Sequence, residues 1–123
     1  MNDKELVAHA ALEYVKDNSI IGLGTGSTAN IFIEMLAEKI RSRSLNISVV
    51  ASSVSSQQKA HDAGLKYISL DQITEIDLYV DGADEITNNL EILKGRGFDL
   101  IREKLLAKIS KQFIVIGDNS KIV

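Results

Sequence analysis

Hydrophobic residues recur along this chain at two alternating spacings, one helical and one extended. Between Lys4 and Lys16 they form one stripe at helical spacing, which predicts an amphipathic helix. The next apolar run is short and ends at glycines, which predicts a strand. In chain order, the predicted elements are a helix Lys4–Lys16, a strand Ser19–Leu23, a helix through Ile31, Phe32, Met35, Leu36 and Ile40, a strand Leu45–Val50, a helix Ser53–Ala63 with Gly64 at its C′ position, an extended segment Leu65–Leu70, a strand Ile76–Val80, a helix Phe98–Ile109 and a strand Phe113–Ile116.

This alternation of strands and helices predicts a single α/β domain over residues 1–123. Parallel neighbours in a sheet need a covering connection, which is usually a helix. With right-handed crossovers the result is a Rossmann-like open parallel sheet with helices on both faces. The chain has no proline, and no repeat or low-complexity linker divides it.

Polar clusters follow four of the predicted strands, at the point where each strand ends. They are Gly24–Thr28, Ser52–Ser53, Asp81–Asp84 and Gly117–Asp118. In an open α/β sheet the carboxyl ends of the strands face the ligand crevice. We therefore expect these four loops to converge on one site.

Charge and residue types restrict what such a site would bind. Lys and Arg number 14 against 17 Asp and Glu, the net charge is −3, and no basic stripe indicates a nucleic-acid or membrane partner. Cysteine is absent, and we interpret His9 and His61 as structural, so we expect no metal site. The first residues lack the apolar core of a signal peptide, and no apolar run approaches the roughly 20 residues of a membrane span. We expect a cytoplasmic protein.

The segment Gly24–Thr28 has the composition of a phosphate-binding loop. It lies between a predicted strand and a predicted helix, so its amides and hydroxyls would meet a phosphate at the positive end of that helix. The alternative is a tight turn in which Ser27 or Thr28 caps the helix without binding a ligand. Neither the dinucleotide fingerprint nor the Walker A motif is present, which favours a terminal monophosphate over a nucleotide.

Asp81 and Asp84 flank a turn at the end of a predicted strand. Two carboxylates about 5 Å apart repel by roughly 3 kcal/mol at an effective dielectric constant of about 20, which would separate their titrations and allow one acid and one base. The alternatives are a solvated Asx turn and a Mg²⁺ site. The residue types alone leave these three interpretations open.

A glycine-rich basic segment, Lys94–Gly97, precedes the helix that carries Arg102, Glu103 and Lys104. Its lysine is suited to stabilise a developing oxyanion, and Glu103 is suited to move a proton between neighbouring carbons. The alternative for Arg102–Lys104 is a solvated helix face. Physical reasoning does not select Glu103 by itself.

Together these motifs carry a family resemblance. In order, the segments Gly22–Thr28, Tyr79–Glu85, Lys94–Gly97, Arg102–Lys104 and Asp118–Lys121 resemble those of ribose-5-phosphate isomerase A. The resemblance covers nearly the whole chain. It implies a cofactor-free aldose–ketose isomerase of the non-oxidative pentose phosphate pathway, which interconverts D-ribose 5-phosphate and D-ribulose 5-phosphate and acts as a homo-oligomer, in this family a homodimer.

The resemblance also implies roles for individual residues. Glu103 matches the base that shuttles a proton through a cis-enediol intermediate, Asp81 and Asp84 match residues that contact the sugar and assist ring opening, and Lys94 matches the residue that stabilises charge at the reacting oxygens. The implied substrate-binding residues are Thr25, Gly26, Ser27, Thr28, Gly95, Arg96, Gly97 and Lys121.

The chain departs from the family pattern in two respects. Phe98 and Asp99 stand where small residues are usual, and Arg96 stands where glycine is frequent, which bears on the geometry of that loop. Family members are also longer, and their further segments complete the sheet and add a small α+β domain that is absent from this chain. The alternative function is therefore a catalytically inactive sugar-phosphate-binding or sensing module, or an inactive fragment.

Overall fold

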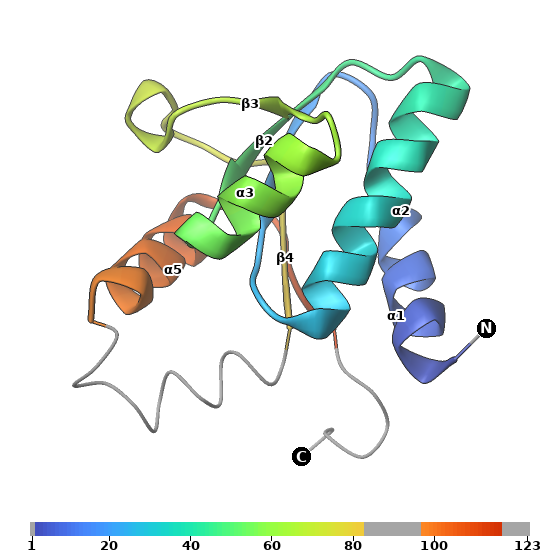
Figure 1. The fold of residues 1–123 in the computed structure, drawn as a ribbon. Helices are drawn as coiled ribbons and strands as arrows, with labels where there is room; N and C mark the ends of the chain where they lie inside the picture. The colour runs from blue at the N-terminus through green and yellow to red at the C-terminus, as the bar shows by residue number, and fades with distance from the viewer. Residues whose placement is uncertain (1, 83–96, 117–123) are drawn as a thin grey trace.

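A computed structural model describes residues 2–82 and 97–116 of the chain and shows a five-stranded sheet, all of it parallel, with strand order β3-β2-β1-β4-β5 (Figure 1). The elements are α1 (Asp3–Leu12), β1 (Ser19–Leu23), α2 (Ser27–Arg43), β2 (Ile47–Ala51), α3 (Val54–Asp62), β3 (Lys66–Tyr67), the 3-10 turn η1 (Leu70–Gln72), β4 (Leu78–Gly82), α5 (Gly97–Ile109) and β5 (Phe113–Ile116). None of the helices within these described ranges is long and apolar enough to cross a bilayer.

The strand order places a change of direction next to β1, the central strand. From β1 the chain proceeds outward through β2 to β3, and it then returns to add β4 and β5 on the other side of β1. Ligand crevices of open α/β sheets lie at such a switch point, beyond the carboxyl ends of the two diverging strands. In this chain those strands are β1 and β4, which pair in register with Gly22 opposite Tyr79.

Helices cover both faces of the sheet, as the sequence predicts. On one face α1, α2 and α3 pack over side chains that alternate along the strands, with Ile21, Val49 and Val80 among the buried residues. On the other face Leu106 of α5 packs with Tyr79 in a second buried cluster. The site at the switch point is therefore supported by two hydrophobic layers.

Several element boundaries differ from the prediction, among them those of β2, which runs from Ile47 to Ala51 rather than from Leu45 to Val50, and the start of β4, at Leu78 rather than Ile76. The first helix ends at Leu12 rather than Lys16, because Tyr14 and Val15 donate to carbonyls three residues back and the Lys39 ammonium donates to the Leu12 carbonyl at 2.8 Å. The predicted extended segment Leu65–Leu70 pairs only at β3 and then turns into η1. Strand β4 extends to Gly82, past the predicted end at Val80, because Asp81 and Gly82 pair with β5.

Candidate functional site

The loop between β1 and α2, residues Gly24–Thr28, is built to leave a helix N-terminus open, and we refer to it as the phosphate loop. The N-cap of α2 is Gly26, whose φ of 108° and ψ of 174° suit glycine alone. Neither Ser27 nor Thr28 is the cap, which corrects the alternative drawn from the sequence, since both already belong to the helix. Gly26 has no side chain with which to cap α2, and the first turn of the helix has no acidic residue. The first amides of this 17-residue helix are thus arranged to receive an anion.

Gly22 in β1 and Gly24 at the start of the phosphate loop serve packing rather than ligand approach. A Cβ on Gly22 would lie 2.9 Å from Cδ1 of Tyr79, and a Cβ on Gly24 would overlap the carboxylate of Asp81. Gly22 pairs with Tyr79 in the β1–β4 ladder, and Gly24 directly follows the last paired residue of β1. A Cβ on Gly26, in contrast, would meet nothing within 4 Å, so only the third glycine is explained by backbone conformation and open space.

The Asp81 carboxylate is buried, with 1% of the residue exposed, and it is held by hydrogen bonds on both oxygens. Oδ1 accepts from the amides of Gly82 at 2.8 Å and of Thr25 at 3.1 Å, and Oδ2 accepts from the Tyr79 hydroxyl at 2.6 Å. Hydrogen bonds of this kind are what make a buried carboxylate tolerable. Asp81 therefore connects the end of β4 to the phosphate loop.

Four hydroxyl residues join the phosphate loop to the loop after β2, and we refer to them as the hydroxyl cluster: Thr25, Ser52, Ser53 and Ser56. Oγ1 of Thr25 lies 3.0 Å from Oγ of Ser52 and 2.6 Å from Oγ of Ser53. Ser53 is also the N-cap of α3, in a capping box with Ser56. All four residues are buried, and their hydroxyls find hydrogen-bond partners in one another and, for Ser53 and Ser56, in the backbone of the capping box.

A cation that the sequence motifs did not indicate lies beside the phosphate loop. The Lys4 ammonium, in the first turns of α1, donates to Oγ of Ser27 at 2.8 Å. Its position results from the packing of α1 against α2, a contact between segments more than twenty residues apart. The sequence shows a lysine in an amphipathic helix and gives no signal for this contact.

Of the predicted site residues, the structure brings together Thr25, Gly26, Ser27, Thr28 and Asp81 with Ser52 and Ser53. The predicted residues Asp84, Lys94, Gly95, Arg96 and Lys121, and the segment Gly117–Asp118, lie outside the described residues. Gly97 is the first residue of α5, and Glu103 lies in the same helix, with a side chain outside the described part. Because Leu106 of α5 packs in one cluster with Tyr79, the helix covers the face of the sheet that carries Tyr79 and Asp81.

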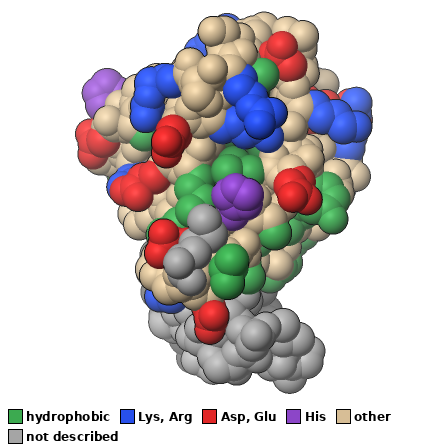
Figure 2. All heavy atoms as spheres, turned by 90° about the vertical axis from the view of Figure 1, so that its right-hand side faces the viewer, with side chains coloured by type: hydrophobic (Ala, Val, Ile, Leu, Met, Phe, Trp, Pro, Cys, Tyr) green, Lys and Arg blue, Asp and Glu red, His purple; other side chains and the backbone are tan. Residues whose placement is uncertain are grey.

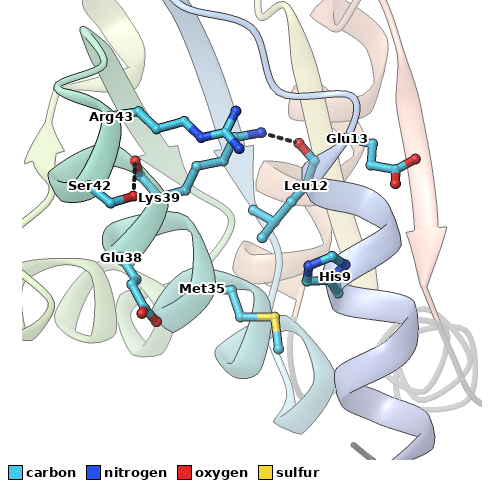
Figure 3. Close-up of a pocket in the computed structure, with 8 residues that line it drawn as sticks. All are labelled: His9, Leu12, Glu13, Met35, Glu38, Lys39, Ser42 and Arg43. Carbon is cyan, nitrogen blue, oxygen red and sulfur yellow. Dashed lines mark hydrogen bonds between the residues drawn. The ribbon is translucent and has the colours of Figure 1, made fainter.

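A groove between α1 and α2 lies away from the phosphate loop (Figure 3). Its lining residues are His9, Leu12, Glu13, Met35, Glu38, Lys39, Ser42 and Arg43. The Lys39 ammonium is used to satisfy the Leu12 carbonyl at the end of α1. The face formed by α1 and α2 carries hydrophobic side chains in its middle, with acidic and basic side chains spread around them (Figure 2). We interpret the groove as the seam of the helix pair.

The described residues contain no group of three His, Cys, Asp or Glu side chains placed to hold a metal ion. Among the described residues, two amides and a tyrosine hydroxyl donate hydrogen bonds to Asp81. A Mg²⁺ ion at this carboxylate would have to displace donors from it.

Comparison with known proteins adds the family context. The family model described as "Ribose 5-phosphate isomerase A (phosphoriboisomerase A)" matches residues 48–123. A protein of Rhodopseudomonas palustris named ribose-5-phosphate isomerase A is 46% identical over 120 residues, which cover 98% of this chain and 51% of that protein. One of the same name from Bartonella bacilliformis is 42% identical with the same coverage. The chain spans about half the length of the curated relatives it matches.

Solved structures agree with the fold. Ribose 5-phosphate isomerase A of Methanocaldococcus jannaschii superposes with a TM-score of 0.82 at 33% identity, over 98% of this chain and 53% of that one. A D-ribose-5-phosphate isomerase in complex with phospho-erythronic acid superposes with a TM-score of 0.84 at 39% identity, over 100% of this chain and 56% of that one. The fold and the sequence thus point to the same family.

Proposed function

Because this chain belongs to the ribose-5-phosphate isomerase A family, we propose that it carries the sugar-phosphate site and the acid/base groups of an enzyme that interconverts D-ribose 5-phosphate and D-ribulose 5-phosphate. The observation that carries the proposal is the α2 N-terminus, left without a side-chain cap at Gly26 and joined to the buried Asp81 through the amide of Thr25. A solved relative is in complex with phospho-erythronic acid, which supports a phosphorylated sugar as the ligand class.

The phosphate of the substrate would bind at the phosphate loop. The amides at the start of α2 and the positive end of its dipole favour an anion there. The Lys4 ammonium, bonded to Ser27, adds a full positive charge at the same place. With a net charge of −3 for the chain, this local arrangement has to supply the attraction.

The proposed chemistry is a proton transfer between neighbouring carbons of the open-chain sugar. Glu103 would take the proton from C2 of the aldose while the C1 oxygen gains one, which gives the cis-enediol. Return of a proton to C1 and loss of the O2 proton then gives the ketose, so that no atom is gained or lost. Lys94 would stabilise charge on the reacting oxygens, Asp81 and Asp84 would contact the sugar and assist ring opening, and the remaining substrate contacts would come from Gly95, Arg96, Gly97 and Lys121.

Glu103→Gln tests this assignment, because it removes the base and keeps the size of the side chain. We expect kcat for ribose 5-phosphate to fall by at least about a hundredfold while binding of ribose 5-phosphate, measured by calorimetry, stays close to that of the unchanged chain. The matched control is Glu38→Gln, an exposed glutamate on α2, which should change neither quantity. Near-normal turnover in Glu103→Gln would show that the base is another residue.

The same assay separates catalysis from binding alone. If the 123-residue chain binds ribose 5-phosphate in the calorimeter but shows no conversion to ribulose 5-phosphate, it is a sugar-phosphate-binding module or an inactive part of the enzyme. If it binds neither ribose 5-phosphate nor ribulose 5-phosphate, the proposed ligand class is wrong.

We also propose, from the family resemblance, that residues 1–123 form part of the catalytic domain of a cytoplasmic homo-oligomer. Light scattering coupled to size exclusion measures the oligomeric state of the chain. A monomer at all concentrations would contradict the homodimer that the resemblance implies. Fractionation of the source cells tests the compartment.

A further inference from the structure

Tyr79 holds one oxygen of the carboxylate on which the phosphate loop depends. Its hydroxyl donates to Oδ2 of Asp81 at 2.6 Å, while Oδ1 of the same carboxylate accepts from the Thr25 amide at 3.1 Å. A rotation of the carboxylate that lengthens one of these bonds changes the other, because both oxygens belong to one rigid plane. The orientation of the Thr25 amide is therefore coupled to the Tyr79 hydroxyl.

The position of the Tyr79 ring is fixed from three sides. On β5 the ring of Phe113 stacks on it, with centroids 4.8 Å apart and planes within 10°. On β1 the missing side chain of Gly22 leaves the space that the ring fills. From α5 Leu106 packs in the same buried cluster, and Tyr79 is only 1% exposed. A ring held in this way presents its hydroxyl at one place.

The spacing of residues on the two strands matches this arrangement. Tyr79 and Asp81 are two residues apart on β4 and so lie on one face of the sheet, and Gly22 of β1 and Gly24, which directly follows that strand, have the same spacing. Each glycine stands opposite one of the two large side chains and makes room for it. The two pairs form one unit across the ladder.

We propose that Tyr79 is a positioning residue of the sugar-phosphate site. Its hydroxyl fixes the orientation of the Asp81 carboxylate, and that carboxylate fixes the position of the Thr25 amide and so the conformation of the phosphate loop. The inference rests on the proposed function of that loop. It gives Asp81 a role in loop geometry in addition to any contact with the sugar. It also makes Tyr79, which touches no substrate in this scheme, a determinant of substrate affinity.

Tyr79→Phe tests the proposal because it removes the hydroxyl and keeps the ring that packs between Gly22 and Phe113. In the ¹H–¹⁵N spectrum of the 123-residue chain, the amide resonance of Thr25 should move and its hydrogen exchange should become faster, since its acceptor oxygen keeps the Gly82 amide but the other oxygen of the same carboxylate loses the Tyr79 hydroxyl. The dissociation constant for ribose 5-phosphate should rise by roughly tenfold, the effect expected for a hydrogen bond to a charged group. Tyr14→Phe, which removes the hydroxyl of an exposed tyrosine, is the control and should change neither.

A pair of substitutions at Asp81 distinguishes positioning from a purely acid/base role. Asp81→Asn keeps an oxygen that accepts from Thr25 and places an amide opposite the Tyr79 hydroxyl, so the resonance and the hydrogen exchange of the Thr25 amide should be largely retained. Asp81→Ala should shift the resonance and speed the exchange. If the Thr25 amide responds equally in the asparagine and alanine variants, the proposal is wrong.

A merely structural role for Tyr79 has its own signature. In that case Tyr79→Phe lowers the free energy of unfolding but leaves the Thr25 amide and the affinity unchanged, and this result overturns the proposal. If the unchanged chain binds no ribose 5-phosphate, the proposed function fails. The response of the Thr25 amide to Tyr79→Phe still decides the positioning role, so the two failures are distinguishable.

Discussion

Gly24, the residue directly after β1, lies against Asp81 of β4, and the Asp81 carboxylate fills the space that a Cβ on Gly24 would occupy. This relationship explains why the first residue of the phosphate loop is glycine. The carboxylate reaches the amide of Thr25 only because no side chain stands between them.

Gly24→Ala should therefore disturb both stability and binding. The overlap with the carboxylate forces β1 and β4 apart or turns Asp81 away from Thr25, at a cost of about 1–3 kcal/mol in the free energy of unfolding. Denaturant unfolding and calorimetry with ribose 5-phosphate measure the two effects. The control is Gly64→Ala. Its φ of 78° is unfavourable for alanine and lowers stability, but the new Cβ would meet no atom within 4 Å, so binding of ribose 5-phosphate should persist. A Gly24→Ala variant with unchanged stability and affinity would refute this account of the contact.

Thr25→Val should destabilise the chain through the hydroxyl cluster. The substitution keeps the shape of the side chain but leaves the buried hydroxyls of Ser52 and Ser53 without their shared partner. An unmet hydrogen bond of this kind costs about 1–3 kcal/mol. Thr25→Ser keeps the hydroxyl, so its free energy of unfolding, measured with urea, should fall by less than half as much as that of Thr25→Val. Equal decreases in the two variants would mean that the hydroxyl of Thr25 is not the source of the stabilisation.

Local signals in the sequence were sufficient for most of the fold. The helix predicted from Ser53 to Ala63 is confirmed as Val54–Asp62, with Ser53 and Ala63 as its caps, and the predicted Gly64 follows its end with a positive φ. The parallel sheet with helices on both faces is confirmed as well, since each strand and helix has its own hydrophobic pattern. Such features depend on neighbours within a few residues.

Features that depend on distant partners were missed or misplaced. The end of α1 at Leu12 involves Lys39 of another helix, and the contact of Lys4 with Ser27 depends on how α1 packs on α2. The roles of Gly22 and Gly24 depend on which strand becomes the neighbour of β1. The sequence predicts a glycine-containing phosphate loop, and only the position of β4 beside β1 shows that Gly22 and Gly24 accommodate Tyr79 and Asp81.

Lys4→Gln should weaken sugar-phosphate binding without loss of the fold. Glutamine can still donate to Ser27, so the change removes mainly the positive charge beside the phosphate loop. We expect the dissociation constant for ribose 5-phosphate to rise about fivefold at low salt, equivalent to about 1 kcal/mol, and the difference to shrink as salt screens the charge. Lys66→Gln on β3, at the far edge of the sheet, is the control. The same affinity in both variants would exclude Lys4 from the site.

At the opposite end of the sheet, Lys111 provides a prediction about pH. The hydrogen bond and charge of Glu75, with a further contribution from Asp77, raise the pKa of the Lys111 ammonium above its ordinary value of 10.5. The sign follows from linkage: this contribution to stability is complete below the ordinary pKa and disappears as pH rises through the raised one. In an NMR titration Glu75→Gln should bring the pKa of Lys111 down toward 10.5, and more so than Asp77→Asn. An unchanged pKa in Glu75→Gln would contradict the assigned cause.

The central claim is that the phosphate loop of this chain binds a sugar phosphate, and a ¹H–¹⁵N titration of the 123-residue chain with ribose 5-phosphate tests it most directly. The account predicts saturable shifts of the amides of Thr25, Gly26, Ser27 and Thr28, with little change in the groove between α1 and α2. Shifts confined to that groove, or no saturable shift in the phosphate loop, would contradict it.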